Sequence, residues 1–391
     1  MNMKQMGTIM VLLITMFLGF GIIIPLVPEI LEGNNSIHLG LMLALYSAAS
    51  FIMSPIWGGL SDKYGRKPIL LIGTIGFSIS FYVFAIGLDS LTLMYLSRIL
   101  GGLFSGAVIA CAVAYVADIT TDETRTRGMG LVGMSIGLGF VFGPPIGGLL
   151  STISYAFPFY ASSILTVLLF FFVLAYIKEP VKQKKEKEEK GKQSKRQRYG
   201  AAVAGPMKYL YILGFVVSFT LAGVEATFQF YQIVKIGATP AQVGIMLGAS
   251  GLLGALIQGG IVRRIKPGKE SQFIMLGLIL TASGFFLILL SNNVFTAGLY
   301  LCVFGAGNAL LRPCITSLIT KKTKVEYGVA TGLSSSMDSL GRIVGPVLGT
   351  LLFDWKANLP FIVFGVITIT AVLIVLQYRK YEKLDTLQAA A

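Results

Sequence analysis

The chain has 391 residues, of which 54% are hydrophobic and 13% charged, and its mean hydropathy is +0.77. This composition lies far outside the range of water-soluble domains, so it excludes a soluble enzyme or a soluble binding module. A bilayer core about 30 Å thick takes about 20 helical residues per crossing, which leaves room for about a dozen crossings. The net charge of +14 would suggest a nucleic-acid partner only if the basic residues shared one soluble face.

Apolar runs of about 20 residues, separated by polar breaks, predict an all-α membrane protein with twelve transmembrane helices. The predicted helices are 6–28, 40–60, 69–88, 92–117, 128–150, 157–177, 207–232, 241–263, 272–291, 295–320, 327–352 and 358–378. The first run has no small-residue cleavage site, so we interpret it as a retained span and not as a signal peptide. An even number of crossings places both termini on the same side of the membrane.

The basic residues are distributed unequally between the two sides of the membrane. Of the 32 Lys and Arg residues, 26 lie at the termini or in even-numbered loops, whereas the odd-numbered loops hold only Lys235 and Lys356. The positive-inside rule therefore predicts a multi-pass protein of the cytoplasmic membrane with both termini in the cytoplasm. The basic charge is thus a topology signal, and we expect no nucleic-acid partner.

One long polar segment, Lys178–Gly200, contains ten Lys or Arg residues and four Glu. Such a segment cannot bury a core, so we expect a solvated cytoplasmic linker, with contact to anionic lipid as the alternative. The predicted organisation is a bundle at 1–177, a linker at 178–206, a second bundle at 207–378 and a cytoplasmic tail at 379–391.

The two halves carry similar sequence elements. Gly143-Pro144 lies in the helix 128–150, and Gly345-Pro346 lies 202 residues later in the helix 327–352. The repeat predicts two pseudo-symmetric six-helix bundles. Many secondary transporters are built in this way, with the substrate site between the repeats near the midplane.

The loop after the second predicted helix reads Gly58-Gly-Leu-Ser-Asp-Lys-Tyr-Gly-Arg-Lys-Pro68. Glycine permits close packing at a helix end, and Asp62 and Arg66 need partners of opposite charge. The pattern resembles the signature loop of the major facilitator superfamily. The resemblance implies a conformational latch built on Gly59, Asp62, Gly65 and Arg66, which would dock the helix 40–60 against the helix 327–352 of the other half.

Three further segments narrow the resemblance: Gly19-Phe-Gly-Ile-Ile-Ile-Pro-Leu-Val-Pro28, Arg98-Ile-Leu-Gly-Gly-Leu-Phe-Ser-Gly106 and the element around Gly143. They look like motifs of the twelve-helix drug:proton antiporters, most of all the NorA- and Bmr-type bacterial multidrug efflux pumps. The resemblance implies export by alternating access. Glycine and proline soften a helix, so the bending positions are expected at Gly143, Pro144, Gly147, Gly345 and Pro346.

A charged residue inside a membrane span is costly and is a functional candidate by default. Glu225 lies in the helix 207–232, on a polar stripe with Ser218, Gln229 and Gln232. In a desolvated position its carboxyl group would carry a proton and, when ionised, attract a cation. Glu225 is therefore the favoured proton carrier; the alternative is a polar group that is satisfied within the bundle.

Arg98 enters the helix 92–117 to nearly the same depth as Glu225. The resemblance places the helices that carry them along one central cavity, so Arg98 and Glu225 would face each other and influence proton binding. The alternative is that the Arg98 side chain only extends toward the membrane surface.

Two more helices carry intramembrane charges. The helix 295–320 has Asn308, Arg312 and Thr316 on one stripe, and it lacks the acidic residue that the resembling pumps carry before Arg-Pro. In the helix 327–352, Asp338 and Arg342 stand four residues apart, the spacing of a self-neutralising pair. The alternative is that Asp338 is a second protonatable group.

The predicted function is proton-coupled export of hydrophobic, often cationic drugs, with the proton as coupling ion and with no enzyme activity, metal, cofactor or obligatory protein partner. Aromatic and methionine-containing walls favour such promiscuity. Candidate substrate contacts are Phe20, Tyr46, Met134, Phe228, Gln229, Tyr231, Asn308 and Arg312. The alternatives are an uptake symporter or facilitator for a defined metabolite and a membrane sensor, which would need a domain outside the membrane.

Overall fold

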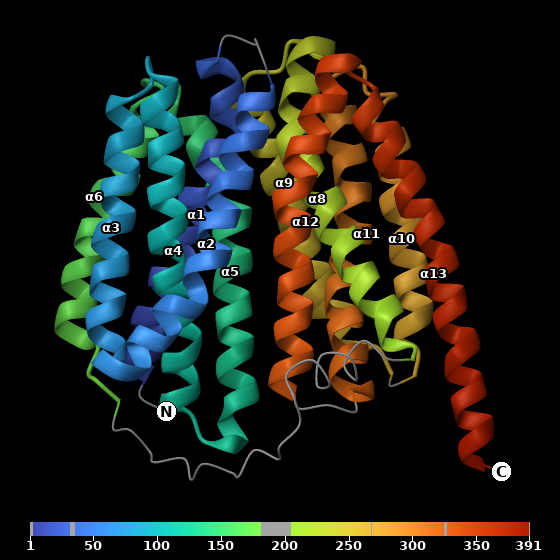
Figure 1. Ribbon diagram of the computed structural model, residues 1–391. Helices are drawn as coiled ribbons and strands as arrows, with labels where there is room; N and C mark the ends of the chain where they lie inside the picture. The colour runs from blue at the N-terminus through green and yellow to red at the C-terminus, as the bar shows by residue number, and fades with distance from the viewer. Residues whose placement is uncertain (1–2, 32–35, 181–204, 267, 324–326, 391) are drawn as a thin grey trace. The chain divides into compact units, whose positions relative to one another are not determined.

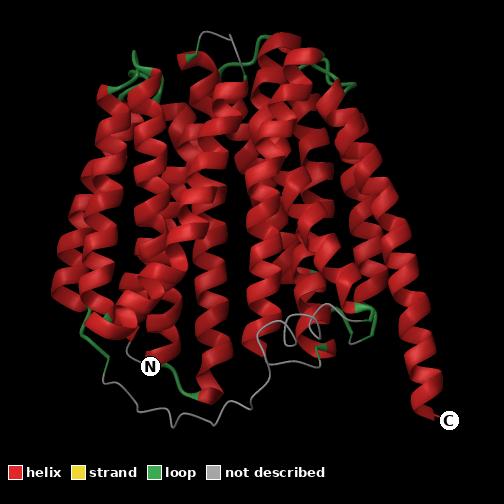
Figure 2. Cartoon of the chain, viewed as in Figure 1, coloured by secondary structure: helices red, strands yellow, loops and turns green. Residues whose placement is uncertain are grey.

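The computed structural model describes residues 3–31, 36–180, 205–266, 268–323 and 327–390 as a set of long α-helices (Figure 1). The first six are α1 Met3–Ile30, α2 Ile37–Tyr64, α3 Arg66–Ile86, α4 Leu91–Ile119, α5 Asp122–Leu150 and α6 Phe157–Tyr176. The others are α8 Met207–Ile236, α9 Pro240–Gly260, α10 Glu270–Ile288, α11 Val294–Lys322, α12 Tyr327–Trp355 and α13 Leu359–Ala390, with a short 3-10 turn η1 at Val262–Arg264. Figure 2 shows no strand in these described ranges.

These twelve helices confirm the predicted all-α class. Eleven of them are long and apolar enough to cross a membrane, by length and composition. The exception among the described helices is α12, whose sequence carries Asp338 and Arg342 together with a run of serines. The largest boundary difference is at α13, which continues past residue 378 to Ala390 because a helix does not have to end where its apolar run ends.

The contacts of the chain form two compact units. Unit 1 comprises Met1–Lys184 with Gly237–Gly248, and unit 2 comprises Lys185–Ile236 with Ala249–Ala391. The predicted linker lies outside the described residues over 181–204. The predicted bundles 1–177 and 207–378 stay a prediction.

Helix packing inside the two units follows one pattern. In unit 1, α1 packs along α5 and α3 packs between α4 and α6; in unit 2, α8 packs along α12 and α10 packs between α11 and α13. Glycines permit the closest of these approaches. A Cβ on Gly143 would lie 2.6 Å from the Leu18 carbonyl oxygen of α1, and one on Gly345 would strike the Phe219 carbonyl oxygen of α8. The Gly-Pro repeat therefore marks the same tight helix pair in both units.

We expect Gly143→Ala to destabilise the protein by about 1–3 kcal/mol, because an added methyl group would force α5 away from the α1 backbone. Gly137→Ala on the same helix is the matched control, since a Cβ there would meet no described atom within 4 Å. The control should be neutral or slightly stabilising, as alanine is the better helix former. Thermal unfolding in detergent measures both, and equal midpoints for the two variants would contradict the tight packing.

Candidate functional site

Glu225 of α8 forms an ion pair with Arg342 of α12, in which Glu225 Oε2 lies 3.6 Å from Arg342 Nη1. The two side chains are 14% and 22% exposed, so water has limited access to both charges. Helices α8 and α12 pack along each other, which brings Glu225 and Arg342 together. This distance exceeds the length of a charge-assisted hydrogen bond, about 2.7–2.9 Å, so Arg342 holds the Glu225 carboxylate only loosely.

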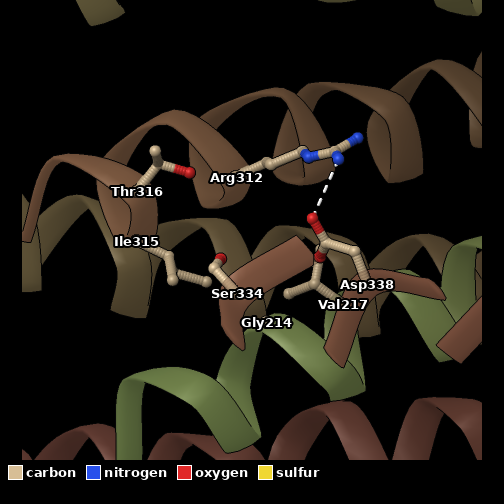
Figure 3. Close-up of a pocket in the computed structure, with 7 residues that line it drawn as sticks. All are labelled: Gly214, Val217, Arg312, Ile315, Thr316, Ser334 and Asp338. Atoms are coloured by element: carbon tan, nitrogen blue, oxygen red, sulfur yellow. Dashed lines mark hydrogen bonds and ion pairs between the residues drawn. The ribbon is translucent and has the colours of Figure 1, made fainter. Parts of the chain in front are cut away.

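A second ion pair in unit 2 joins α11 and α12. Arg312 Nη2 lies 2.9 Å from Asp338 Oδ2, and the Ser218 hydroxyl of α8 donates to Asp338 Oδ1 at 2.8 Å. Figure 3 shows the Arg312 side chain reaching across to the Asp338 carboxylate. Asp338 is 18% exposed and Arg312 is 55% exposed, so solvent reaches this pair mainly from the arginine side.

The two ion pairs lie one after the other along the contact of α8 with α12. Ser218 and Glu225 are seven residues apart on α8, and Asp338 and Arg342 are four residues apart on α12, so both sets repeat on one helix face. Asp338 and Arg342 thereby each have an ion-pair partner on another helix, which the spacing within the sequence did not predict. The role of Asp338 in proton coupling stays a prediction.

A small hollow lies beside the Arg312–Asp338 pair. Its lining comes from α8, α11 and α12, and it consists of Gly214, Val217, Arg312, Ile315, Thr316, Ser334 and Asp338 (Figure 3). The free volume is about 10 Å³, room for about one water molecule and far too little for a drug. The hollow therefore lies against the carboxylate of Asp338 but is not a drug site in this conformation.

The two glutamines of the predicted polar stripe on α8 are buried in this structure. Gln229 and Gln232 have no exposed surface, and Gln232 accepts a hydrogen bond from Ser291. Phe228 is likewise fully buried, and the ring centroid of Tyr231 lies 4.7 Å from that of Phe361. Phe228, Gln229 and Tyr231 therefore line no open cavity in this conformation, and as substrate contacts they stay predictions.

Arg98 of α4 is buried inside unit 1. It is 2% exposed, its Nη2 donates to Ser97, and its guanidinium carbon lies 4.6 Å from the ring centroid of Phe84 and 5.6 Å from that of Phe81. Its Nε has no hydrogen-bond partner among the described residues. The structure thus excludes the alternative in which the side chain extends to the membrane surface, whereas an Arg98–Glu225 relation, which would join the two units, stays a prediction.

The other predicted substrate contacts have different surroundings. Phe20 of α1 packs with its ring centroid 5.1 Å from that of Tyr46 and 5.6 Å from that of Phe140. Met134 of α5 is 48% exposed. Asn308 of α11 has a buried amide nitrogen without a hydrogen-bond partner among the described residues. These contacts also stay predictions.

The signature loop forms a charge network around Arg66, the first residue of α3. Arg66 Nη1 lies 2.7 Å from Asp62 Oδ1, and Arg66 Nε lies 2.9 Å from Asp118 Oδ2 at the end of α4. Gly65 has the positive φ of 104° that favours glycine, whereas a Cβ on Gly59 would meet no described atom within 4 Å. The docking of this loop onto α12 concerns both units and stays a prediction.

The Arg312–Asp338 pair is testable by a double-mutant cycle. Asp338→Asn keeps an oxygen for Ser218 but leaves Arg312 without its carboxylate, and Arg312→Gln leaves the carboxylate without its cation. If the pair is structural, each single variant should lower export several-fold and the double variant should recover part of the loss, because neither charge is then left alone. Efflux from cells with equal protein levels measures this, and a double variant as inactive as Asp338→Asn would instead make Asp338 a proton site.

The comparison with known families agrees with the signature loop, the two repeated units and the set of twelve helices. The sequence model of the Major Facilitator Superfamily matches residues 9–326 and 268–390. The chain belongs to the Major Facilitator Superfamily. It is therefore a multi-pass membrane transporter and not an enzyme.

Among curated proteins, the chain is 32% identical over 352 residues to Multidrug resistance protein 1 of Bacillus subtilis (strain 168), covering 88% of each chain. It is 30% identical over 383 residues to Quinolone resistance protein NorA of Staphylococcus aureus (strain COL), covering 97% of each. These matches confirm the predicted resemblance.

Solved structures with the same fold include the human organic anion transporter MFSD10, with a TM-score of 0.71 at 23% identity over 95% of this chain and 99% of that one. The nucleoside transporter NupG has a TM-score of 0.76 at 14% identity over 98% of this chain and 100% of that one. At these identities the likeness shows the fold alone.

Sequence reasoning missed several members of these networks. Asp118 and Glu179 bind the Arg66 loop, although neither stands in a recognisable motif. The position of Glu179 was visible in the sequence, because it stands two residues after Ile177, where the apolar run of α6 ends. The helix partners of Asp338 and Arg342 had no such signal, since they depend on which helices pack together.

Proposed function

We propose that the protein exports hydrophobic, often cationic drugs from the cytoplasm in exchange for protons. Relatives that match most of the chain are named for multidrug and quinolone resistance, which supports drugs as the substrate class. The observation that carries the coupling is the Glu225–Arg342 pair, a mostly buried carboxylate held loosely by a cation on a neighbouring membrane helix.

The pair suggests how proton binding would be linked to movement. Protonation of Glu225 removes its charge and leaves Arg342 without attraction to α8, whereas ionised Glu225 draws Arg342 back and can also attract a cationic substrate. Since Gly345 places α8 and α12 in close contact one turn away, a change in this pair acts directly on the packing of the two helices. Proton and drug would thus compete for the same state of unit 2.

The topology and the bending positions complete the proposed transport cycle. Both termini and the linker would lie in the cytoplasm, as the distribution of basic residues predicts. Arg98 would contribute to coupling, and the glycine and proline positions of α5 and α12 would accommodate the change between inward and outward access.

Purified protein in liposomes with an imposed proton gradient tests the function. Drug accumulation in the compartment from which protons leave, and proton movement opposite to the drug, are the expected results for a lipophilic cation such as ethidium. Drug and protons moving in the same direction would indicate the uptake symporter, and drug movement without any proton movement would indicate a facilitator.

A further inference from the structure

The two units have an ion pair at corresponding positions, but the acidic and the basic residue are exchanged between the two helices. In unit 1, the first residue of α3, Arg66, pairs with the penultimate residue of α4, Asp118. In unit 2, the first residue of α10, Glu270, pairs with the penultimate residue of α11, Lys321. The positions correspond because α3 and α4 of unit 1 repeat as α10 and α11 of unit 2.

The sign matters because helix ends carry partial charges. A helix N-terminus attracts negative groups and a helix C-terminus attracts positive groups. Glu270 at the start of α10 and Lys321 at the end of α11 satisfy both preferences, and Glu270 also accepts a hydrogen bond from the Gly268 backbone at 2.7 Å. In unit 1 both preferences are unmet, because the cation Arg66 stands at the start of α3 and the anion Asp118 stands near the end of α4. The ion pair of unit 1 thus places no acid at the N-terminus of α3.

Glu179, which lies beyond the end of α6, supplies that acid. Its Oε1 accepts a hydrogen bond from the Arg66 backbone nitrogen at 2.6 Å, and its Oε2 accepts one from the Lys67 backbone nitrogen at 2.9 Å. Gly65 leaves the space for this carboxylate, since a Cβ there would lie 2.8 Å from it. One side chain thus satisfies two amides that the first turn of a helix leaves without partners.

Two more hydrogen bonds hold the last turn of α6 and the residues after it against α3 and α4. The Tyr115 hydroxyl of α4 donates to the Lys178 carbonyl oxygen at 2.9 Å, and Lys67 Nζ donates to the Leu174 carbonyl oxygen at 2.7 Å. The chain leaving α6 is therefore attached to both α3 and α4, beside the Arg66 network.

We propose that Glu179 is a positioning residue that anchors the first residues of the predicted linker on α3 and fixes the geometry of the Arg66 network. The network depends on the first turn of α3, because Arg66 is its first residue and reaches Asp62 and Asp118 from there. Loss of Glu179 releases the chain after α6 and leaves the first turn of α3 without its anion. The transport effect expected below rests on the proposed function, whereas the anchoring itself does not.

Hydrogen exchange and transport, measured on the same full-length variants, test the proposal. Glu179→Ala should raise amide exchange in the first turn of α3 by about tenfold or more, and Glu179→Gln should give an intermediate value because it keeps one acceptor oxygen. Glu382→Ala is the matched control: Glu382 lies 203 residues later but pairs with Lys322 at 2.9 Å, and it should leave the exchange of α3 unchanged.

In the transport assay, Glu179→Ala should lower maximal drug export by about fivefold, with the substrate concentration for half-maximal export unchanged, since a conformational step is affected and not drug binding. Unchanged exchange at Arg66 and Lys67 in Glu179→Ala would overturn the anchor, whatever the protein transports. Faster exchange with normal export would overturn the positioning role. A protein that transports no drug at all, yet shows the exchange difference, would count against the proposed function alone.

Discussion

Glu225→Gln is expected to reduce proton-driven drug export by at least about tenfold while the protein stays folded and still binds substrate. Glutamine has nearly the same size and keeps a hydrogen-bonding group toward Arg342, but it can neither take up nor release a proton. Glu225 is also the one acidic residue in the sequence of α8. Cells that express the variant at the normal level should lose resistance to a lipophilic cation, and dye efflux from them should become insensitive to the proton gradient.

Glu29→Gln in α1 is a suitable control for the loss of a carboxylate and should keep export near normal. Full resistance in the Glu225→Gln variant would exclude Glu225 as the proton carrier. If Asp338→Asn were the variant that lost coupling, the proton carrier would be Asp338 of α12, the ion-pair partner of Arg312.

Arg342→Gln should also reduce export by about tenfold or more at neutral pH, for the opposite reason. Without the guanidinium, the ionised carboxylate of Glu225 loses the cation that lies 3.6 Å away, so the proton is bound but released poorly. The defect should shrink as the pH rises, because a higher pH favours proton release, whereas the Glu225→Gln defect should be the same at every pH. Dye efflux measured between mildly acidic and mildly alkaline pH separates the two cases.

Arg264→Gln in the exposed turn η1 is the control for the loss of a positive charge and should behave like the unmodified protein. Two superimposable pH profiles for Arg342→Gln and the unmodified protein would show that Arg342 does not act on proton exchange at Glu225.

The helices could be predicted from the sequence because a bilayer imposes both a length and an apolar composition on every span. All twelve expected helices formed, including α12, whose charges lower its hydropathy. Helix ends that lie outside the membrane are not predicted in this way, because the bilayer does not set their position. The residues from Arg379 onward continue α13 as a helix, although an apolar window ends before them.

The residues of the site were easier to predict than their partners. An acid and a base four residues apart in α12 were recognisable, but the spacing suggested that Asp338 and Arg342 pair within the helix. In the structure, Asp338 pairs with Arg312 of α11 and Arg342 pairs with Glu225 of α8, because α12 packs beside both helices. Such pairings follow from tertiary packing, which a single sequence does not encode locally.

Arg98 illustrates the same point from unit 1. The depth of the residue in its helix was predictable, but the rings of Phe81 and Phe84 that receive the guanidinium lie on α3, and hydropathy alone cannot say which phenylalanines face α4. The sequence therefore predicted that Arg98 lies deep in the membrane but not which side chains surround its guanidinium.

Competition between drug and proton at Glu225 can be measured as proton release on drug binding, which needs neither a membrane gradient nor a transport cycle. A lipophilic cation is added to purified protein in weakly buffered detergent solution, with a pH indicator present. We expect the unmodified protein to release protons when the cation binds, at pH values at which Glu225 is protonated, and we expect Glu225→Gln to bind the same cation without releasing any. Equal proton release from both proteins would contradict the claim that drug and proton compete at Glu225.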